Sequence, residues 1–446
     1  MNPHPLVWHM AAGYQVPGGI EAHVLHYASE MRNQGFDTRV VVFKPLPRER
    51  HRFLAALEQR GIPILSLDDL SARRARWKAA GLLLPWRLYT AFVKGRRPNA
   101  AHFRIWVQHR ESGRALSALL AKEAPDLIHI FGRLRTDAWA RFPAERTIFH
   151  EMMTGTVDRH WTQNELAQFR GFAARAARYF APGNGVAENV RREFGIQRPI
   201  DAVFTMCPDE AGREESGVRS QESGEAAQRH ASGVATDLAR GWPAASSAEQ
   251  SAIGNRQSPM AARRFGVICR LTGQKGIPFL LEALKLYRER HGQVHFTFGG
   301  FGPMQEEIER FARTHDLPHV RIVPVGRPAD ILATLDVFVH PSVDDAMPMA
   351  IAEALMCGVP CIVCRVGGCA DLVCDGVEGF VIEPRRPEQI LERMERFAGM
   401  SADERDAFRR RARARYEEVC RPEKVGREVA GHYRAILEKA GSCIAM

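Results

Sequence analysis

The stretch HPSVDDAMPMAIAEALMCGVP, residues 340–360, decides the fold because it holds the end of a strand, a loop and a helix in direct succession. An apolar run ends at His340, the loop after it presents Asp345, and the helix begins near Pro348, a residue suited to a first helical turn. Strands that alternate with helices predict a parallel sheet covered by helices. We therefore expect an α/β domain around this stretch.

Two acids in this stretch are candidate ligand-binding residues. Asp345 and Glu353 are separated by seven residues, so they can hold hydroxyl groups at two places on a long ligand. The pattern favours a polyhydroxylated ligand, although a capping Asp345 and a surface or paired Glu353 would need no ligand. The start of the helix can also receive an anion on its backbone, in the segment Ala346, Met347, Pro348 and Met349.

The alternation of strands and helices extends through the second half of the chain. Helices are predicted at Pro278 to Arg290 and Gln305 to Thr314, between runs that read as buried strands. Helical spacing continues from Pro387 to Lys439, and such tail helices could pack back across the first half. The predicted strands are residues 265–269, 294–298, 320–325, 337–340, 361–364 and 380–382.

Two strand-end loops of this half carry further candidates. Arg270 and Lys275 are cations five residues apart beside a helix start, an arrangement that suits the oxygens of a diphosphate. Two solvated surface cations fit this loop equally well. Gly300 and Gly302 follow the next strand, where glycine lets backbone amides approach a ligand or simply forms a turn.

The first half opens with a β-α-β unit of its own. It has a strand at 6–10, a loop with Gly18 and Gly19, a helix at 20–33 and a strand at 38–43. Strands at 127–131 and 147–150 extend this sheet. Two such sheets that face one another create a cleft at the carboxyl ends of their strands, which is where open α/β sheets bind ligands.

The chain divides into four segments on this basis. Residues 1–207 form the first Rossmann-like domain, residues 263–420 the second, and residues 421–446 a C-terminal helix. The segment 208–262 is rich in Ser, Ala, Gly, Glu, Gln and Arg without a sustained period, which predicts a disordered insertion. A regulatory or docking segment is the functional alternative for this insertion.

Composition restricts the location and the partners. Hydrophobic residues make up 45% and charged residues 26% of the 446 residues, which is typical of a globular protein. The amino terminus lacks a signal-peptide pattern, and no apolar run approaches the roughly 20 residues that span a bilayer, so we expect a cytoplasmic protein. The net charge of +10 favours anionic partners. Nucleic acid has only this charge in its favour, so we expect no nucleic-acid binding.

Cysteines cluster in and just after residues 340–360. Their spacing matches no usual zinc or iron–sulfur pattern. Residues 360–366 read as a buried strand in which cysteine acts as a small apolar residue, so we expect no metal site. The five clustered residues, out of nine cysteines in the chain, are Cys357, Cys361, Cys364, Cys369 and Cys374.

Taken together, these motifs resemble the retaining glycosyltransferases of family 4, which have the GT-B fold. Nearly the whole chain apart from the insertion meets the family pattern in order. The pattern is a glycine loop after the first strand, an Arg and Lys pair in a G-R-L-x-x-x-K-G loop, a G-x-G-P turn, and H-P-S before E-x7-E. The resemblance implies two Rossmann-like doubly wound domains that face a central cleft.

The resemblance also assigns roles to the candidate residues. It places Arg270 and Lys275 on the donor diphosphate, Glu353 on the nucleotide ribose, and Asp345 on the hydroxyls of the transferred sugar. Gly18 and Gly19 would lie across the cleft near the phosphates or the acceptor, in the first domain.

A histidine at the end of a first-domain strand is a further candidate. The family often has a catalytic-site histidine there, and His150, which is followed by Glu151, occupies the corresponding place. His150 could form a hydrogen bond to the sugar near the reacting carbon, or it could be a satisfied strand-end residue. We interpret His129, in the preceding strand, as a structural neighbour.

Two positions depart from the family pattern. Asp345 stands where the family usually has Glu, which shortens the reach by one methylene, and Cys269 replaces the usual Gly before Arg270. Because a carboxylate is kept at the first position, we expect an altered sugar preference more than a lost activity.

The resemblance implies a hexosyltransferase without a metal ion or another cofactor. No Asp-x-Asp motif lies at a strand end, so Arg270, Lys275 and helix amino termini must neutralise the departing diphosphate. By analogy with the family, the nucleotide leaves from the face that the acceptor hydroxyl attacks, which preserves the anomeric configuration. The expected substrates are a nucleotide-sugar donor and a carbohydrate or lipid-linked acceptor, as in cell-surface polysaccharide or glycolipid synthesis.

Residues 73–97 offer a candidate membrane contact. Arg73, Arg74, Arg76, Trp77 and Lys78 precede an apolar and aromatic run at 82–89 and further cations at 94–97. This mixture could rest on an anionic bilayer at the inner membrane face and meet a lipid-linked acceptor. A solvated helix pair that covers the first domain explains the pattern equally well.

Two other functions fit the same sequence. One is a non-catalytic nucleotide-binding GT-B scaffold, which Asp345, Cys269 and the long insertion would suit. Nucleotide binding without turnover would support that scaffold. The other is a different GT-B enzyme, such as a sugar-nucleotide epimerase or a phosphorylase, which analysis of the products would distinguish.

Overall fold

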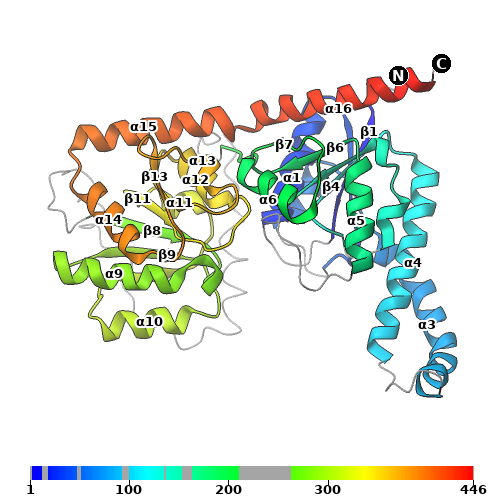
Figure 1. The fold of residues 1–446 in the computed structure, drawn as a ribbon, viewed down its shortest axis with the longest axis horizontal. Helices are drawn as coiled ribbons and strands as arrows, with labels where there is room; N and C mark the ends of the chain where they lie inside the picture. Colours follow the sequence, from blue (N-terminus) through cyan, green and yellow to red (C-terminus); the bar gives the residue numbers. More distant parts are fainter. Residues whose placement is uncertain are drawn as a thin grey trace.

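The computed structural model describes residues 3–12, 19–47, 52–92, 100–134, 137–152, 163–209 and 263–444. It contains two parallel sheets, one in each half of the chain, and helices cover both (Figure 1). The predicted fold class, two Rossmann-like domains, is therefore confirmed. The predicted insertion lies outside the described residues from position 210 onward.

The first sheet is a seven-stranded parallel sheet in the order β3-β2-β1-β4-β5-β6-β7. The order reverses beside β1, so helices lie on both faces and strand ends meet at the switch between β1 and β4. The central strands β1 and β4 are buried along nearly their whole length, as a sheet covered on both faces requires, and each carries one histidine among apolar residues. Their bounds are β1 Leu6–Ala11, β2 Asp37–Val42, β3 Ile64–Ser66, β4 Leu127–Phe131, β5 Thr147–His150, β6 Arg178–Ala181 and β7 Asp201–Ala202.

Helices follow most of these strands. Helix α1 begins at Gly19 and buries an apolar face that includes Val24, Tyr27 and Met31 against the sheet. Helix α6 ends at Gly195, whose φ of +65° is the left-handed conformation that commonly closes a helix. The helices of this domain are α1 Gly19–Asn33, α2 Arg52–Gln59, α3 Leu67–Phe92, α4 Ala100–Glu123, α5 Gln163–Arg175 and α6 Asn184–Phe194.

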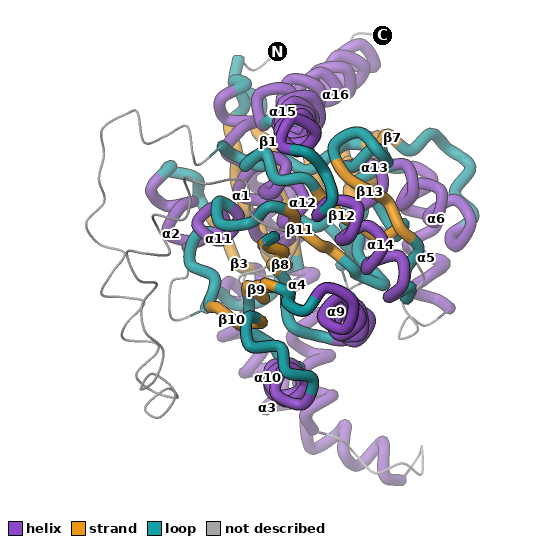
Figure 2. The backbone as a smooth tube through the Cα atoms, turned by 90° about the vertical axis from the view of Figure 1, so that its left-hand side faces the viewer, coloured by secondary structure: helices purple, strands orange, loops and turns teal. Residues whose placement is uncertain are grey.

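Helices α3 and α4 form an antiparallel hairpin. Leu67 and Leu116, near its base, join the core beneath the sheet, while the rest of the hairpin projects from the domain (Figure 1). Figure 2 shows α3 at the end of the molecule opposite to α16. The pair thus covers the first domain only at its base.

The second sheet is a six-stranded parallel sheet in the order β10-β9-β8-β11-β12-β13, with the switch point between β8 and β11. The strands are β8 Arg264–Ile268, β9 His295–Gly299, β10 Val320–Val323, β11 Val337–His340, β12 Cys361–Cys364 and β13 Gly379–Ile382. The helices are α9 Ile277–His291, α10 Gln305–Thr314, α11 Pro328–Leu332, α12 Met349–Met356, α13 Cys369–Leu372, α14 Pro387–Ala398 and α15 Ala402–Val419.

The last helix returns to the first domain. Helix α15 packs on the second domain through residues such as Ala412 and Tyr416. Helix α16, Pro422–Ile444, then inserts Val425, Val429 and Tyr433 into the core of the first domain. The two helices lie end to end along one side of both domains (Figure 1).

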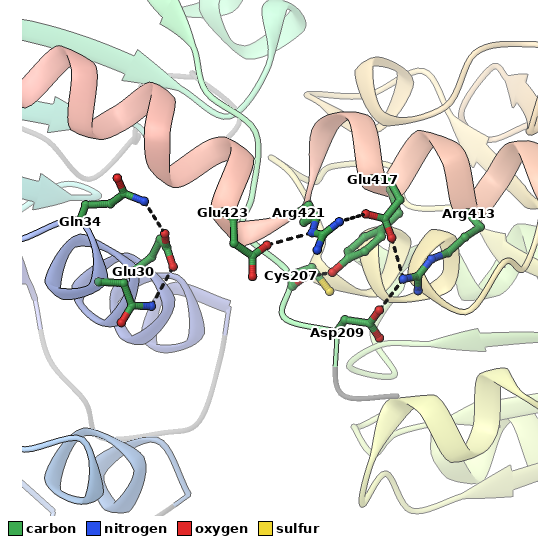
Figure 3. Close-up of polar contacts among 10 residues, drawn as sticks. Glu30, Gln34, Cys207, Asp209, Arg413, Glu417, Arg421 and Glu423 are labelled. Carbon is green, nitrogen blue, oxygen red and sulfur yellow. Dashed lines mark hydrogen bonds and ion pairs between the residues drawn. The ribbon is translucent and has the colours of Figure 1, made fainter. Parts of the chain in front are cut away.

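The two places where the chain passes between the domains are held together (Figure 3). The amide of Cys207 donates to the carbonyl of Cys420 at 3.0 Å, and the Tyr416 hydroxyl donates to the carbonyl of Cys207 at 2.7 Å. Arg413 forms ion pairs with Asp209 and with Glu417. The two crossings therefore act as one connection, and a cavity of about 700 Å³ lies between this connection and α1.

Within the described ranges, no helix has both the length and the apolar character that crossing a bilayer requires.

Candidate active site

The loops after β8 and β11 meet because these strands are neighbours at the switch point. The amide of Val343 donates to the carbonyl of Gln274 at 3.0 Å, and the Ser342 hydroxyl donates to the same carbonyl at 3.2 Å. Gly276 has a φ of +73°, and a Cβ there would lie 1.8 Å from the carbonyl oxygen of Pro341. Only glycine fits this contact, so Gly276 fixes how closely the two loops approach.

Lys275 and Asp345, which these loops carry, form an ion pair. The Nε2 atom of His340 also donates to Asp345 Oδ2, at 2.9 Å. His340 is buried, and its Nδ1 atom has no hydrogen-bond partner in the described part of the chain. The end of β11 therefore fixes Asp345 from one side while the β8 loop fixes it from the other.

Electrostatics keep Asp345 ionised. Burial acts to raise the pKa of Asp345, but the hydrogen bond from His340 and the charge of Lys275 outweigh burial and lower the pKa to about 2. Sequence reasoning placed Lys275 and Asp345 on different parts of a donor. The structure joins them, so a diphosphate that binds Lys275 must share this cation with Asp345.

Arg270 lies in the same loop, two residues beyond the end of β8. Its side chain is exposed, and no hydrogen bond or ion pair joins it to the residues that the structure describes. An unpaired guanidinium at a strand end is suited to bind a phosphate by two parallel hydrogen bonds. Of the two predicted diphosphate ligands, Arg270 is the one whose charge is not already paired.

Gly300 and Gly302 have a structural reason to be glycine. A Cβ on Gly300 would lie 2.0 Å from the carbonyl oxygen of Cys269, and one on Gly302 would lie 2.4 Å from that of Leu271. The Gly300 amide donates to the carbonyl of Val323 at 3.0 Å, so it is not available to a ligand. These glycines let the loop after β9 pack against the loop that carries Arg270.

Helix α12 begins directly after this site. Pro348 caps its start in an extended conformation, and Glu353, half-buried, follows in the next turn. Ala346 accepts a hydrogen bond from the amide of Gly368 at 2.5 Å, which braces the loop against the turn after β12. Met347 is buried. The first turn of α12 leaves backbone amides without helical partners, as every helix start does.

His150 ends β5 in the first domain, and it is buried. Burial and the nearby His23 lower its pKa to about 3, so its imidazole is neutral at physiological pH. Glu151, the next residue, is fully buried and pairs with Arg133 at 2.9 Å. The Tyr179 hydroxyl donates to the same carboxylate at 3.3 Å. Glu151 therefore has a structural ion pair, whereas His150 remains the candidate for chemistry.

Thr205, which lies just before the first passage between the domains, contacts both the first domain and helix α12 of the second domain. The Thr205 hydroxyl lies 3.0 Å from Nδ1 of His23, the histidine that influences His150. The same hydroxyl lies 2.9 Å from the sulfur of Met349, the first residue of α12. Of the predicted glycines across the cleft, Gly19 starts α1 and Gly18 lies outside the described residues.

A contact between the domains was not predicted from the sequence. The Asp371 carboxylate, on α13, accepts a hydrogen bond from the amide of Gly185 at 3.0 Å, in the first turn of α6. A Cβ on Gly185 would lie 2.2 Å from the carbonyl oxygen of Gly367. The sequence feature that could have indicated this contact is Gly183-Asn184-Gly185 after β6, because the backbone amides of a glycine-rich helix start can bind a carboxylate.

Three of the five clustered cysteines are apolar core residues, whereas Cys357 is half-buried and Cys374 is exposed. Cys361, Cys364 and Cys369 are buried. Burial raises the pKa of the Cys364 thiol to about 12 and raises those of Cys361 and Cys369 as well, so all three are protonated at neutral pH. Across the described ranges, no three His, Cys, Asp or Glu residues are arranged to hold a metal ion.

Two family models match this chain. The one described as "Glycosyl transferase 4-like domain" matches residues 18–219, and the one described as "Glycosyl transferases group 1" matches residues 262–399. The first match covers the domain with His150, and the second covers the loops with Arg270, Lys275 and Asp345.

Named relatives are similar over part of this chain. The putative colanic acid biosynthesis glycosyltransferase WcaL of Escherichia coli is 25% identical over 179 residues, 38% of this chain and 44% of its own length. The UDP-Gal:alpha-D-GlcNAc-diphosphoundecaprenol alpha-1,3-galactosyltransferase of Escherichia coli is 34% identical over 124 residues, 27% of this chain and 32% of its own. The chain thus aligns with less than half the length of these relatives.

Solved structures share the whole fold. A glycosyltransferase from Rickettsia africae has a TM-score of 0.66 at 12% identity, with 98% of this chain and 99% of that one covered. Anabaena HepE in complex with UDP has a TM-score of 0.63 at 16% identity, with 96% and 99% covered. The motifs, the two family models and the architecture agree, and the chain belongs to the family-4 glycosyltransferases of the GT-B fold.

Proposed function

We propose that this protein is a retaining, metal-independent hexosyltransferase that moves a sugar from a nucleotide-diphosphate donor to an acceptor hydroxyl. The observation that carries the proposal is the convergence of Arg270, Lys275 and Asp345 at the switch point of the second sheet. An exposed guanidinium, a paired ammonium and a fixed carboxylate are the groups that a sugar diphosphate needs. They supply charge for the phosphates and an acceptor for sugar hydroxyls.

The departing diphosphate develops negative charge as the bond to the sugar breaks. Arg270 and Lys275 would neutralise this charge, together with the amides in the first turn of α12. Glu353, half-buried on α12, would hold the nucleotide ribose. These protein groups take the role that a divalent ion has in other transferases, which is why we propose that no metal is needed.

Two residues at the end of β5 support our proposal that the configuration is retained. His150 is neutral and Glu151 is held by Arg133, so at the end of β5 His150 can offer a hydrogen bond to the sugar, while the carboxylate of Glu151 is not free to act as a nucleophile. In our proposal the acceptor attacks on the face from which the nucleotide departs, and a departing phosphate oxygen takes the acceptor proton. The anomeric configuration is then preserved.

The relatives narrow the class of substrate. Anabaena HepE has been solved with UDP and with UDP-glucose, and the aligned galactosyltransferase acts on a diphosphoundecaprenol-linked sugar, according to their names. We infer a nucleotide hexose as donor and a carbohydrate or lipid-linked acceptor for this chain. A role in cell-surface polysaccharide or glycolipid synthesis fits such substrates.

An enzyme that uses a lipid-linked acceptor must reach a membrane surface. Helix α3 has an exposed face that suits such a contact. Leu70, Arg73, Arg74 and Trp77 are exposed and fall on one face of the helix by their spacing. Trp77 exposes 74% of its surface and Leu70 exposes 58%. Apolar side chains flanked by cations suit the interface of an anionic bilayer, so we propose peripheral membrane contact through this face.

Vesicle sedimentation tests the membrane contact. We expect vesicles with a third of anionic lipid to bind the wild type and to shift the Trp77 fluorescence to shorter wavelength. The Trp77→Ala variant should bind at least about fivefold more weakly, whereas Trp77→Phe should retain most of the binding. Equal binding of wild type and Trp77→Ala would rule out this face as the contact.

The activity itself is tested by following released nucleotide with UDP-, GDP- and ADP-hexoses and simple glycoside acceptors, with and without EDTA. We expect one nucleotide series to react, EDTA to have no effect, and the product to keep the donor's anomeric configuration by NMR. Inversion, loss of turnover with EDTA, or epimerised donor without transfer would each contradict the proposal. Nucleotide binding without any turnover would favour a scaffold protein.

A further inference from the structure

The candidate catalytic histidine, His150, belongs to a cluster of buried histidines. His9, His129 and His150 come from the neighbouring strands β1, β4 and β5, and each exposes 2% of its surface or less. Burial lowers the pKa of all three, to about 3 for His9 and His150, so these imidazoles are neutral. A neutral imidazole has one N–H group, and its hydrogen-bond direction depends on which nitrogen carries the proton.

Two of these histidines belong to a continuous hydrogen-bonded line. Nδ1 of His150 lies 3.2 Å from Nε2 of His129, and the two rings are nearly parallel, with 4° between their planes. Nδ1 of His129 lies 2.5 Å from the hydroxyl of Tyr433. Tyr433 belongs to α16, so the line runs from the last helix of the chain through β4 to the end of β5.

The hydroxyl of Tyr433, at one end of this line, sets the direction in which the hydrogen bonds are donated. His129 is the hydrogen-bond partner of the Tyr433 hydroxyl within the described residues, and burial raises the pKa of Tyr433, which keeps the phenol protonated. A phenol donates its proton to the free nitrogen of a neutral imidazole, so His129 accepts at Nδ1 and carries its own proton on Nε2. That proton is then donated to Nδ1 of His150. The proton of His150 consequently lies on Nε2.

We infer that Tyr433 and His129 are positioning residues that fix His150 in its Nε2–H tautomer, so that His150 presents a hydrogen-bond donor to an oxygen of the transferred sugar. The part that concerns the sugar rests on the proposed function. The part that concerns the tautomer rests on the buried line alone. Neither Tyr433 nor His129 needs to touch the substrate, because they act through His150.

The direction of the line has a chemical consequence. A sugar hydroxyl or ring oxygen has free lone pairs, so a fixed N–H donor can hold it in one orientation. With the opposite tautomer, Nε2 would be an acceptor and would favour a rotated hydroxyl. Removing the Tyr433 hydroxyl leaves both tautomers open to the pair and should lower turnover without weakening the binding of the nucleotide.

The tautomers can be read directly from long-range ¹H–¹⁵N spectra of full-length protein labelled with [¹⁵N]histidine, with His129→Gln and His150→Gln used for assignment. We expect both histidines to carry the proton on Nε2 in the wild type and to show mixed or exchanging tautomers in Tyr433→Phe. Tyr27→Phe is the matched control. It removes a buried hydroxyl that bonds to the carbonyl of Phe204 instead of a histidine, so it should leave the histidine signals unchanged.

Kinetics supply the second readout. Tyr433→Phe should lower kcat by about tenfold, the effect of one misdirected hydrogen bond, and change the nucleotide Kd by less than about twofold. A wild-type spectrum with His150 protonated on Nδ1, or unchanged tautomers in Tyr433→Phe, would overturn the inference. Full activity of His150→Ala together with the expected tautomers would instead reject the proposed role of His150 in the reaction and leave the buried line intact.

Discussion

At the scale of single residues, the central feature is the carboxylate of Asp345 between His340 and Lys275. A Glu at this position would have one more methylene with which to reach a ligand. The shorter Asp345 is held by His340 and Lys275, so it is already paired with the ammonium group that a diphosphate would use. Donor binding must therefore exchange one of these contacts for contacts with phosphate and sugar.

The Asp345→Asn variant should separate the two roles of this residue. Without the carboxylate, Lys275 is free and the repulsion of an anionic phosphate is removed, so a nucleoside diphosphate should bind a few-fold more tightly. Turnover should fall by about a hundredfold, because an amide is a weaker acceptor for the sugar hydroxyls in the transition state. Calorimetry and steady-state kinetics measure the two effects.

Asp344→Asn is the matched control for this prediction. Asp344 is the adjacent acid, it is exposed, and it accepts a hydrogen bond from the Gln274 side chain at 3.1 Å. We expect both nucleotide affinity and turnover of this variant to stay close to the wild type. If Asp345→Asn weakened nucleotide binding, or if both variants behaved alike, the assigned competition for Lys275 would be wrong.

The sequence was informative about which residues gather at the site but not about their pairing. Arg270, Lys275 and Asp345 were identifiable because each follows a strand, and parallel strands present their ends on one edge. The Lys275–Asp345 pair depends on how closely two loops 70 residues apart approach, which Gly276 and Pro341 decide through a backbone contact. A pattern of residue types does not contain that distance. The line from His150 to Tyr433, 283 positions away along the chain, is equally non-local.

At the scale of elements, helix α16 joins the first domain through a close contact. A Cβ on Gly426 would lie 2.3 Å from Cγ of Glu30, and the Glu30 carboxylate is itself held by Asn33 and Gln34 (Figure 3). The helix can approach α1 this closely because Gly426 has no side chain. The position of Tyr433, two turns further on, depends on this contact.

Replacement of Gly426 by Ala should therefore destabilise the protein despite the better helix propensity of alanine. The added methyl displaces Glu30, and such overpacking costs about 1–3 kcal/mol. Gly431→Ala in the same helix is the control, because a Cβ there meets nothing within 4 Å; it should gain up to about 1 kcal/mol. Chemical denaturation of both variants gives the comparison, and equal stabilisation by the two alanines would contradict the packing described here.

Most strands of the sheets could be predicted because apolar runs end abruptly at glycine, proline or charged residues. The strand ending at His150 and the strand 361–364 match the structure at both ends. The strands β3, β6 and β7, which have two to four residues each, were missed, because so short a run seldom carries enough pattern to distinguish a strand from a loop. The projection of the α3–α4 hairpin was also unpredictable, since an amphipathic helix pair reads alike whether it covers a sheet or extends from it.

At the scale of the whole molecule, buried histidines should make stability sensitive to mild acid. Burial lowers the pKa of His9 and His150 to about 3, that of His23 to about 4, and that of His129 well below its usual value. In the unfolded chain these groups titrate near pH 6.5. Below that pH the unfolded state binds more protons than the folded state, so acidification favours unfolding.

The melting temperature should thus be nearly constant from pH 8 to 7 and fall steeply below about pH 6.5. Each buried histidine contributes a slope of about 1.4 kcal/mol per pH unit. Neither ring nitrogen of His9 has a partner among the described residues, so His9→Leu should reduce this slope without loss of a hydrogen bond. His109→Leu, at an exposed position on α4, should leave the slope as it is. A flat profile between pH 7 and 5 would argue against a neutral buried cluster.

The proposed activity of the whole molecule requires that the strand-end loops of the second domain bind a nucleotide diphosphate. Isothermal titration of UDP, GDP and ADP, in EDTA, into the wild type, Arg270→Ala and the exposed α10 control Arg313→Ala tests this claim most directly. We predict that one nucleotide binds the wild type and Arg313→Ala alike and binds Arg270→Ala about 10- to 100-fold more weakly, the loss of a charge-assisted contact. Equal affinity for all three proteins, or no binding of any nucleotide, would contradict the site described here.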